Sequence, residues 1–101
     1  MTLELFAGNR VSDFEAAREW YERLLGGEPA FLPHATEAVW ELAEHRYLYI
    51  EQHADGVGMA EHTIFVDDFD ERVAAIAARG LEPAERETSP SVLAKASYGN
   101  P

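Results

Sequence analysis

The feature that most constrains this chain is an internal repeat. Residues 11–15 read VSDFE, and residues 66–70, which follow 55 positions later (66 − 11), read VDDFD. Each copy continues through a stretch with helical spacing to a glycine and then to the letters EPA, at residues 28–30 and 82–84. Solenoid repeats are about 20–50 residues long and need three or more copies. Two copies of this length therefore predict a duplicated supersecondary unit within one domain.

The first copy predicts a β-α-β-β-β unit. Alternating apolar residues over 3–8 indicate a strand. Ser12 and Glu15 form a capping-box pattern ahead of a helix that ends at Gly26. Short runs with strand character follow over 30–33, 37–43 and 46–53.

The second copy predicts the same order of elements. A strand is expected over 59–66, a helix is expected to begin at Asp68 and to end before Gly80, and strands are expected at 82–87 and 91–98. The chain then stops one strand short of the first copy.

We therefore expect an α+β fold in which two βαβββ modules, residues 1–55 and 56–101, form a curved mixed sheet with the helices outside. Its last strand is absent from this chain. The alternative is a ferredoxin-like sandwich, whose repeat is β-α-β. Residues 27–58 disfavour it, because they have room and alternation for three strands where that fold uses two.

Composition excludes several classes of partner. The chain has 101 residues, 47% of them hydrophobic, which fits one globular domain with a small core. Nineteen acidic against eight basic residues give a net charge of −11, which repels nucleic acid and membranes and attracts cations. Without cysteine or an apolar targeting run, we expect a cytoplasmic protein. An open sheet edge and a small core lead us to expect a homodimer.

Taken together, these motifs resemble the vicinal oxygen chelate superfamily, which includes glyoxalases, bleomycin resistance proteins and ring-cleaving dioxygenases. The resemblance covers the whole chain and rests on its order of motifs: Val11 and Asp13 before the helix, the Trp20-Tyr21 pair followed by Leu24-Leu25-Gly26, and residues 66–68 with Gly80 and Pro83. It implies a curved sheet with a ligand cavity on its concave face. It does not imply a reaction, because one fold hosts many functions.

The resemblance also suggests where a metal would bind. The positions similar to the family's ligand positions are Phe6 and Glu61 on the first strand of each repeat, and Glu51 on the fourth strand of the first. Phenylalanine has no donor atom. We therefore predict no metal or other cofactor, with a divalent metal held by Glu51 and Glu61 as the alternative.

Strand alternation gives the expected cavity residues. If Phe6 faces the cavity, Glu4 and Gly8 share its face, and on the second copy Glu61 and Phe65 point inward. The expected ligand-binding residues are Phe6, Tyr47, Tyr49, Glu51, Glu61 and Phe65. Tyrosine rings beside carboxylates suit a cation through ring quadrupole and charge, although an amphipathic strand at a dimer interface has the same pattern.

The histidines have ordinary interpretations. Alternation predicts that His62 points toward the helices, where we expect a buried, hydrogen-bonded imidazole. His34 and His45 lie in turn-like positions and are expected to be exposed to solvent. His53 lies at a strand end, at the cavity mouth or on the surface. We predict no catalytic residue, because no nucleophile motif is present.

The function expected from the sequence is metal-independent sequestration of a small cationic or aromatic molecule by a glyoxalase/bleomycin-resistance-type binding protein. One alternative is a glyoxalase-like divalent-metal enzyme, either a lyase or isomerase or a dioxygenase. The other is a dimeric interaction module that binds no small ligand.

Overall fold

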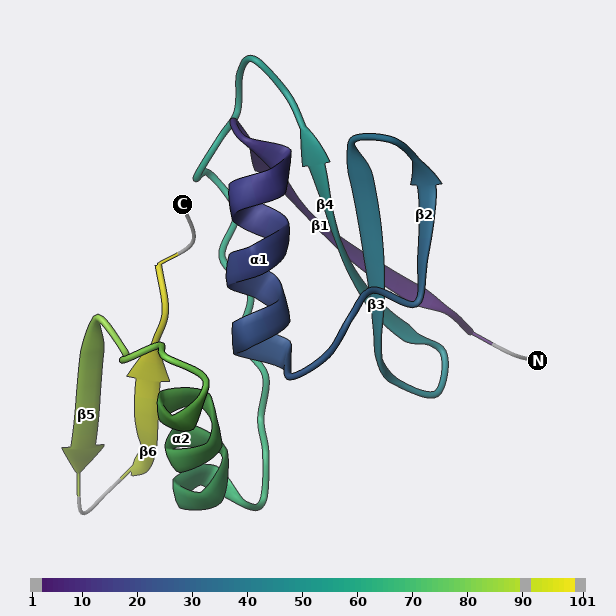
Figure 1. Cartoon of the computed structure of the whole chain (residues 1–101). Coiled ribbons are helices and arrows are strands. Elements are labelled where there is room, and N and C mark those ends of the chain that lie inside the picture. The colour runs from purple at the N-terminus through teal and green to yellow at the C-terminus, as the bar shows by residue number, and fades with distance from the viewer. Residues whose placement is uncertain (1–2, 90–91, 100–101) are drawn as a thin grey trace.

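The computed structural model describes residues 3–89 and 92–99, which form two helices and six strands (Figure 1). The first module contains β1 (Leu5–Val11), α1 (Phe14–Leu25), β2 (Phe31–His34), β3 (Glu37–Ala43) and β4 (Arg46–Gln52). The second contains α2 (Phe69–Ala78), β5 (Glu85–Ser89) and β6 (Val92–Ser97). The α+β class and the βαβββ order of the first module are confirmed.

The strands of the first module form one mixed sheet in the order β1-β4-β3-β2. β1 runs parallel to β4, while β3 runs antiparallel to both β4 and β2. β1 is therefore an edge strand. α1 covers one face of this sheet and lies between it and the second module (Figure 1).

Both ends of α1 are set by local sequence. The Asp13 side chain accepts a hydrogen bond from the backbone N of Ala16 at 3.2 Å, so Asp13 caps the helix. The expectation that Ser12 would cap it is wrong by one residue. Gly26 ends the helix with φ at +88°, a left-handed conformation that glycine adopts without strain.

The hydrophobic core lies between α1 and the sheet. α1 contributes Phe14, Ala17 and Tyr21, and the strands contribute Val11, Ala38, Trp40, Leu48 and Ile50. The polar atoms of the two largest aromatic side chains are satisfied: Trp40 Nε1 donates to the Gly27 carbonyl at 2.9 Å, and Asn9 Nδ2 donates to the Tyr21 hydroxyl at 2.6 Å. Burial raises the pKa of Tyr21, with the Asn9 hydrogen bond acting in the opposite direction.

The second module is much less packed. Its strands β5 and β6 form a two-stranded sheet of their own. α2 begins after Asp68, as expected, and buries Val73. Expected strands 82–87 and 91–98 are found slightly displaced, at 85–89 and 92–97, with residue 91 outside the described ranges.

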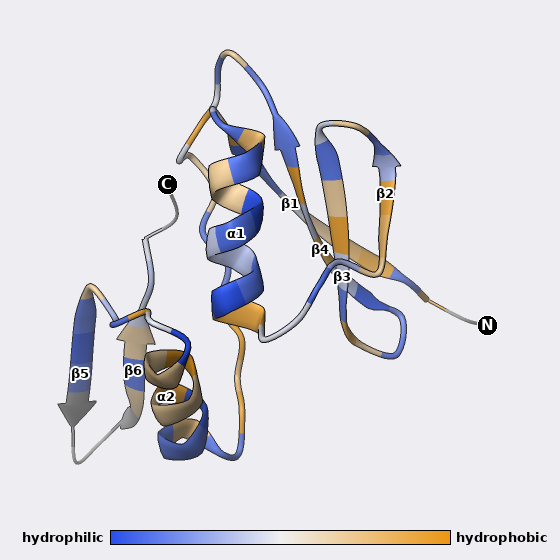
Figure 2. Ribbon diagram, in the orientation of Figure 1, coloured by the Kyte–Doolittle hydropathy of each residue, from blue (hydrophilic) through white to orange (hydrophobic). Residues whose placement is uncertain are grey.

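The strand expected over 59–66 does not form. In the first module, the matching strand β1 is held by its pairing with β4, the fourth strand of the unit. In the described part of the second module, two strands follow the helix, β5 and β6, and they pair with each other. This part therefore contains no equivalent of β4. Residues 59–66 are left without a strand to pair with, and their apolar side chains are exposed: Met59 at 84%, Ile64 at 57% and Phe65 at 81%. Figure 2 shows hydrophobic colour on this connection to α2.

Candidate functional site

The face of the four-stranded sheet opposite α1 carries a row of aromatic and acidic side chains, which we call the open face. Leu48 and Ile50 of β4 pack toward α1, so the residues that alternate with them point the other way. The pairing of β1 with β4 sets Phe6 beside Tyr47 and Gly8 beside Tyr49. The pairing of β3 with β4 adds three more positions to this face, Glu37, Val39 and Glu41.

The aromatic end of the open face is formed by Phe6 and Tyr47. Their ring centroids are 4.3 Å apart and their planes differ by 11°, so the rings are stacked. Phe6 is 46% exposed, which leaves much of this stack accessible to solvent. Partial desolvation raises the pKa of the Tyr47 hydroxyl, as do the nearby carboxylates of Glu41 and Glu4. An aromatic surface with negative charge beside it results.

Gly8 makes room for Tyr49. A Cβ atom at position 8 would lie 2.3 Å from Tyr49 Cζ, so the tyrosine ring rests directly against the glycine backbone. Any larger residue at position 8 would displace this ring. The glycine is therefore a packing requirement of the open face, and Tyr49 connects its aromatic end to its polar end.

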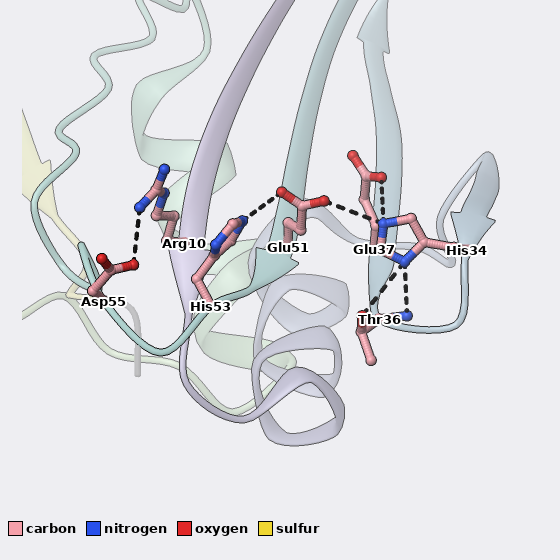
Figure 3. A network of polar contacts seen from close by, with 7 residues as sticks. All are labelled: Arg10, His34, Thr36, Glu37, Glu51, His53 and Asp55. Carbon is pink, nitrogen blue, oxygen red and sulfur yellow. Dashed lines mark hydrogen bonds and ion pairs between the residues drawn. The ribbon is translucent and has the colours of Figure 1, made fainter.

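The polar end is organised around Glu51 (Figure 3). Its two carboxylate oxygens contact different imidazoles: Oε1 lies 2.6 Å from His53 Nε2, and Oε2 lies 3.2 Å from His34 Nε2. The hydrogen bond to His53, and secondarily that to His34, lowers the pKa of Glu51. The same His34 Nε2 lies 3.1 Å from Glu37 Oε1. The row of charges continues to an ion pair between Arg10 and Asp55 at 3.2 Å.

The structure brings together four of the six expected ligand-binding residues: Phe6, Tyr47, Tyr49 and Glu51 lie on the open face. Glu61 and Phe65 lie in the exposed 59–66 segment. His62 was expected to be buried toward the helices, which is wrong. It is exposed, with Nε2 3.3 Å from the Gly8 carbonyl oxygen, because its segment does not form the strand whose alternation would direct it inward.

Three residues of this face were missed by sequence reasoning. His34 was interpreted as a solvated turn residue. The sequence did not show which face of the strand over 37–43 points inward, so Glu37 and Glu41 were not assigned to a face. A signal was present in β3, where Ala38 and Trp40 alternate with Glu37, Val39 and Glu41. If the large Trp40 side chain had been expected to be buried against the helix, alternation would have predicted that both glutamates lie on the opposite face.

Two hollows in the described part of the chain lie away from the open face. They have volumes of about 370 and 450 Å³ and lie beside α1, and their lining includes helix residues such as Glu19 and Glu22. Neither is lined by Phe6, Tyr47, Tyr49 or Glu51. A ligand on the open face would need a second surface to enclose it.

A glyoxalase/bleomycin resistance protein from Catenulispora acidiphila DSM 44928, known from its crystal structure, is 46% identical to this chain. The match covers 99% of this chain and 90% of that one, with a TM-score of 0.95. The chain therefore belongs to the glyoxalase/bleomycin resistance protein family of the vicinal oxygen chelate superfamily. No family model and no curated protein matches it.

The residues at the family's metal-ligand positions do not fit a metal. Phe6 has no donor atom, and Glu61 lies on the exposed 59–66 segment. Within the described ranges, the group of three donors close enough to share an ion consists of His34, Glu37 and Glu51, in which only Glu51 occupies a family position. Separately, no helix in the part of the chain that the structure describes is long and apolar enough to cross a membrane.

Proposed function

We propose that this chain is a cytoplasmic binding protein that holds a small cationic or aromatic molecule on the open face without a metal in the contact. The observation that carries this proposal is the exposed stack of Phe6 on Tyr47, with ring centroids 4.3 Å apart. A planar ligand can extend such a stack, because offset aromatic contacts contribute about 0.5–1.5 kcal/mol beyond the area they bury.

Charge beside the stack favours a cation over an anion. Glu41 lies opposite Tyr47 in the β3–β4 pairing, and Glu4 is close enough to affect the tyrosine pKa. A cation over a tyrosine face gains about 0.5–2 kcal/mol, and a carboxylate at about 4 Å adds roughly 1 kcal/mol in water. Glu51 contributes less to this preference, because both of its oxygens already contact imidazoles. We assign direct attraction of the ligand to Glu41 and Glu4.

The experiment is calorimetric titration with three bicyclic probes of similar shape: cationic N-methylquinolinium, neutral quinoline and anionic naphthoate. We expect affinity to fall in that order, the preference for the cation to weaken with added salt, and chelator to leave binding unchanged. Tryptophan fluorescence is a poor readout, because Trp40 is buried on the opposite side of the sheet.

Two substitutions test the residues, and one serves as a control. Tyr47→Leu should weaken N-methylquinolinium binding about tenfold through loss of the stack, and Glu41→Gln should weaken it about threefold. Phe69→Leu, an aromatic change on α2, is the control and should leave binding unchanged. Stronger binding of naphthoate than of the cation, or unchanged binding by Tyr47→Leu, would contradict the proposal and favour an interaction module without a small ligand.

We further propose that a second copy of the chain covers the open face. Apolar side chains are exposed on the open face and in 59–66, with Phe6 at 46% and Phe65 at 81%. The outer edge of β1 has no partner strand in the sheet that the described residues form. Burying such residues supplies association energy of about 25 cal/mol per Å² of apolar area. Because each copy carries a charge of −11, added salt should strengthen the dimer. Sedimentation showing a monomer at micromolar concentration in both low and high salt would contradict this assembly.

A further inference from the structure

The polar end of the open face places three metal-binding side chains around one point. His34 ends β2, Glu37 begins β3, and Glu51 lies on β4, so each is positioned by a strand or by its end. Their ligand atoms all lie within 4.8 Å of one another. Figure 3 shows contacts from one nitrogen of the His34 ring to both carboxylates.

The two distances from His34 Nε2 to the carboxylates match those between ligands of one metal ion. His34 Nε2 lies 3.1 Å from Glu37 Oε1 and 3.2 Å from Glu51 Oε2. Two atoms bound to the same zinc ion at its usual bond lengths are roughly 2.9–3.6 Å apart in octahedral or tetrahedral geometry. An ion could therefore enter with small movements of these side chains.

Hydrogen bonding alone leaves this cluster incompletely satisfied. Both carboxylates approach His34 Nε2, which can carry a single proton and so serves one of them well. Glu37 and Glu51 also face each other directly in the β3–β4 pairing, where like charges repel. The side chain of Glu37 is only 18% exposed, which limits the relief that water can provide. A divalent cation would neutralise both carboxylates at once.

Neighbouring residues orient the three side chains. His53 Nε2 lies 2.6 Å from the outer oxygen of Glu51, a typical support for a ligating carboxylate. Thr36 Oγ1 and Thr36 N both lie 3.4 Å from His34 Nδ1. The Thr36 hydroxyl can accept a hydrogen bond from Nδ1–H, a tautomer that leaves the Nε2 lone pair free for a metal. The Thr36 backbone N–H, which donates to Nδ1, favours the opposite tautomer in the metal-free protein.

We propose that His34, Glu37 and Glu51 bind one divalent transition-metal ion, such as zinc, at the polar end of the open face. The set of one imidazole and two carboxylates suits zinc, manganese or cobalt, and leaves positions for water. The site shares only Glu51 with the family's ligand positions, because its other two residues, His34 and Glu37, do not lie at those positions. It does not rest on the proposed ligand function, since Glu51 is four residues along β4 from Tyr47, about 13 Å at strand spacing.

The test is calorimetric titration of untagged, metal-free full-length protein with zinc chloride, repeated with cobalt chloride to record the absorption bands of a bound ion. We expect one ion per chain. His34→Ala and Glu37→Gln should each weaken zinc binding at least tenfold, and His53→Ala should weaken it about tenfold by loosening Glu51. Circular dichroism should show that each variant remains folded.

The control is His45→Ala, because His45 is also a partly exposed histidine with carboxylates nearby, Glu4 at 3.4 Å and Glu44 at 3.3 Å. This variant should bind zinc as the unmodified chain does. Equal affinity of the unmodified chain and His34→Ala, or an equal loss in His45→Ala, would show nonspecific surface binding and overturn the site. N-methylquinolinium titration of His34→Ala separates the two proposals, because that binding should be retained.

Discussion

In the first module eight buried residues form the core between α1 and the four-stranded sheet. In the second module, Val73 is the one residue among the described ranges with a buried hydrophobic side chain. The two modules share the sequence pattern at the start of their helices, yet one forms β1 and the other leaves 59–66 unpaired. The difference lies in β4, which supplies both the pairing partner for β1 and the core residues Leu48 and Ile50. Within the described residues, the repeated sequence pattern forms its first strand only in the module whose fourth strand pairs with it.

The largest expected effect compares the same substitution in the two modules. Ile50→Ala removes a fully buried side chain and should lower the free energy of unfolding by about 3–5 kcal/mol. Ile76→Ala on α2, where the side chain is half-buried, should lower it by about 1 kcal/mol or less, partly because alanine favours the helix. Urea unfolding measures both. An equal loss from the two variants would mean that the second module is packed as tightly in solution as the first.

The next effect tests the close packing within the open face. Gly8→Ala puts a methyl group where Tyr49 rests, and should lower the free energy of unfolding by about 1–3 kcal/mol while displacing the ring. Gly27→Ala is the control, because a Cβ there meets nothing within 4 Å. Denaturation midpoints check the pair. If Gly8→Ala is as stable as Gly27→Ala, the arrangement of Tyr49 described above is wrong.

A smaller effect concerns the connection between the modules. Arg79, just after α2, donates through Nη2 to the Leu24 carbonyl at 3.1 Å and through Nε to the Arg23 carbonyl, so it satisfies the C-terminal end of α1. Arg79→Ala should lower the free energy of unfolding by about 1 kcal/mol and speed hydrogen exchange in the last turn of α1. Arg86→Ala, whose contacts lie within the second module, should leave exchange in α1 unchanged. Faster exchange in both variants would contradict this specific role.

The smallest effect is the pH dependence contributed by Glu51. Its pKa is lowered in the folded chain, so its contribution to stability is present above the pKa of the unfolded chain and is lost as pH falls through the lowered folded value. The stability difference between the unmodified chain and Glu51→Gln should therefore shrink as pH falls below the usual glutamate range. In a His53→Ala background, which removes the main cause of the shift, the difference should depend less on pH. Urea midpoints measured at several pH values decide this.

The sequence by itself determined the local elements and the family. The helical spacing and Gly26 placed α1, with its cap predicted one residue too early, and alternation placed β3 and β4 almost to the residue. These signals depend on neighbours along the chain. Alternation also assigned Tyr47, Tyr49 and Glu51 to one face of their strand, since the side chains of a strand point in turn to opposite faces. Phe6 was expected beside them only through the family resemblance, and the β1–β4 pairing places it there.

Contacts between side chains of different strands became known only from the tertiary structure. The stack of Phe6 on Tyr47 depends on the β1–β4 register, and the meeting of His34, Glu37 and Glu51 depends on three strand ends that lie up to 17 positions apart in sequence. The tertiary structure also shows that residues 59–66 do not form a strand. A segment with the right alternation still requires a partner strand to form hydrogen bonds with its backbone.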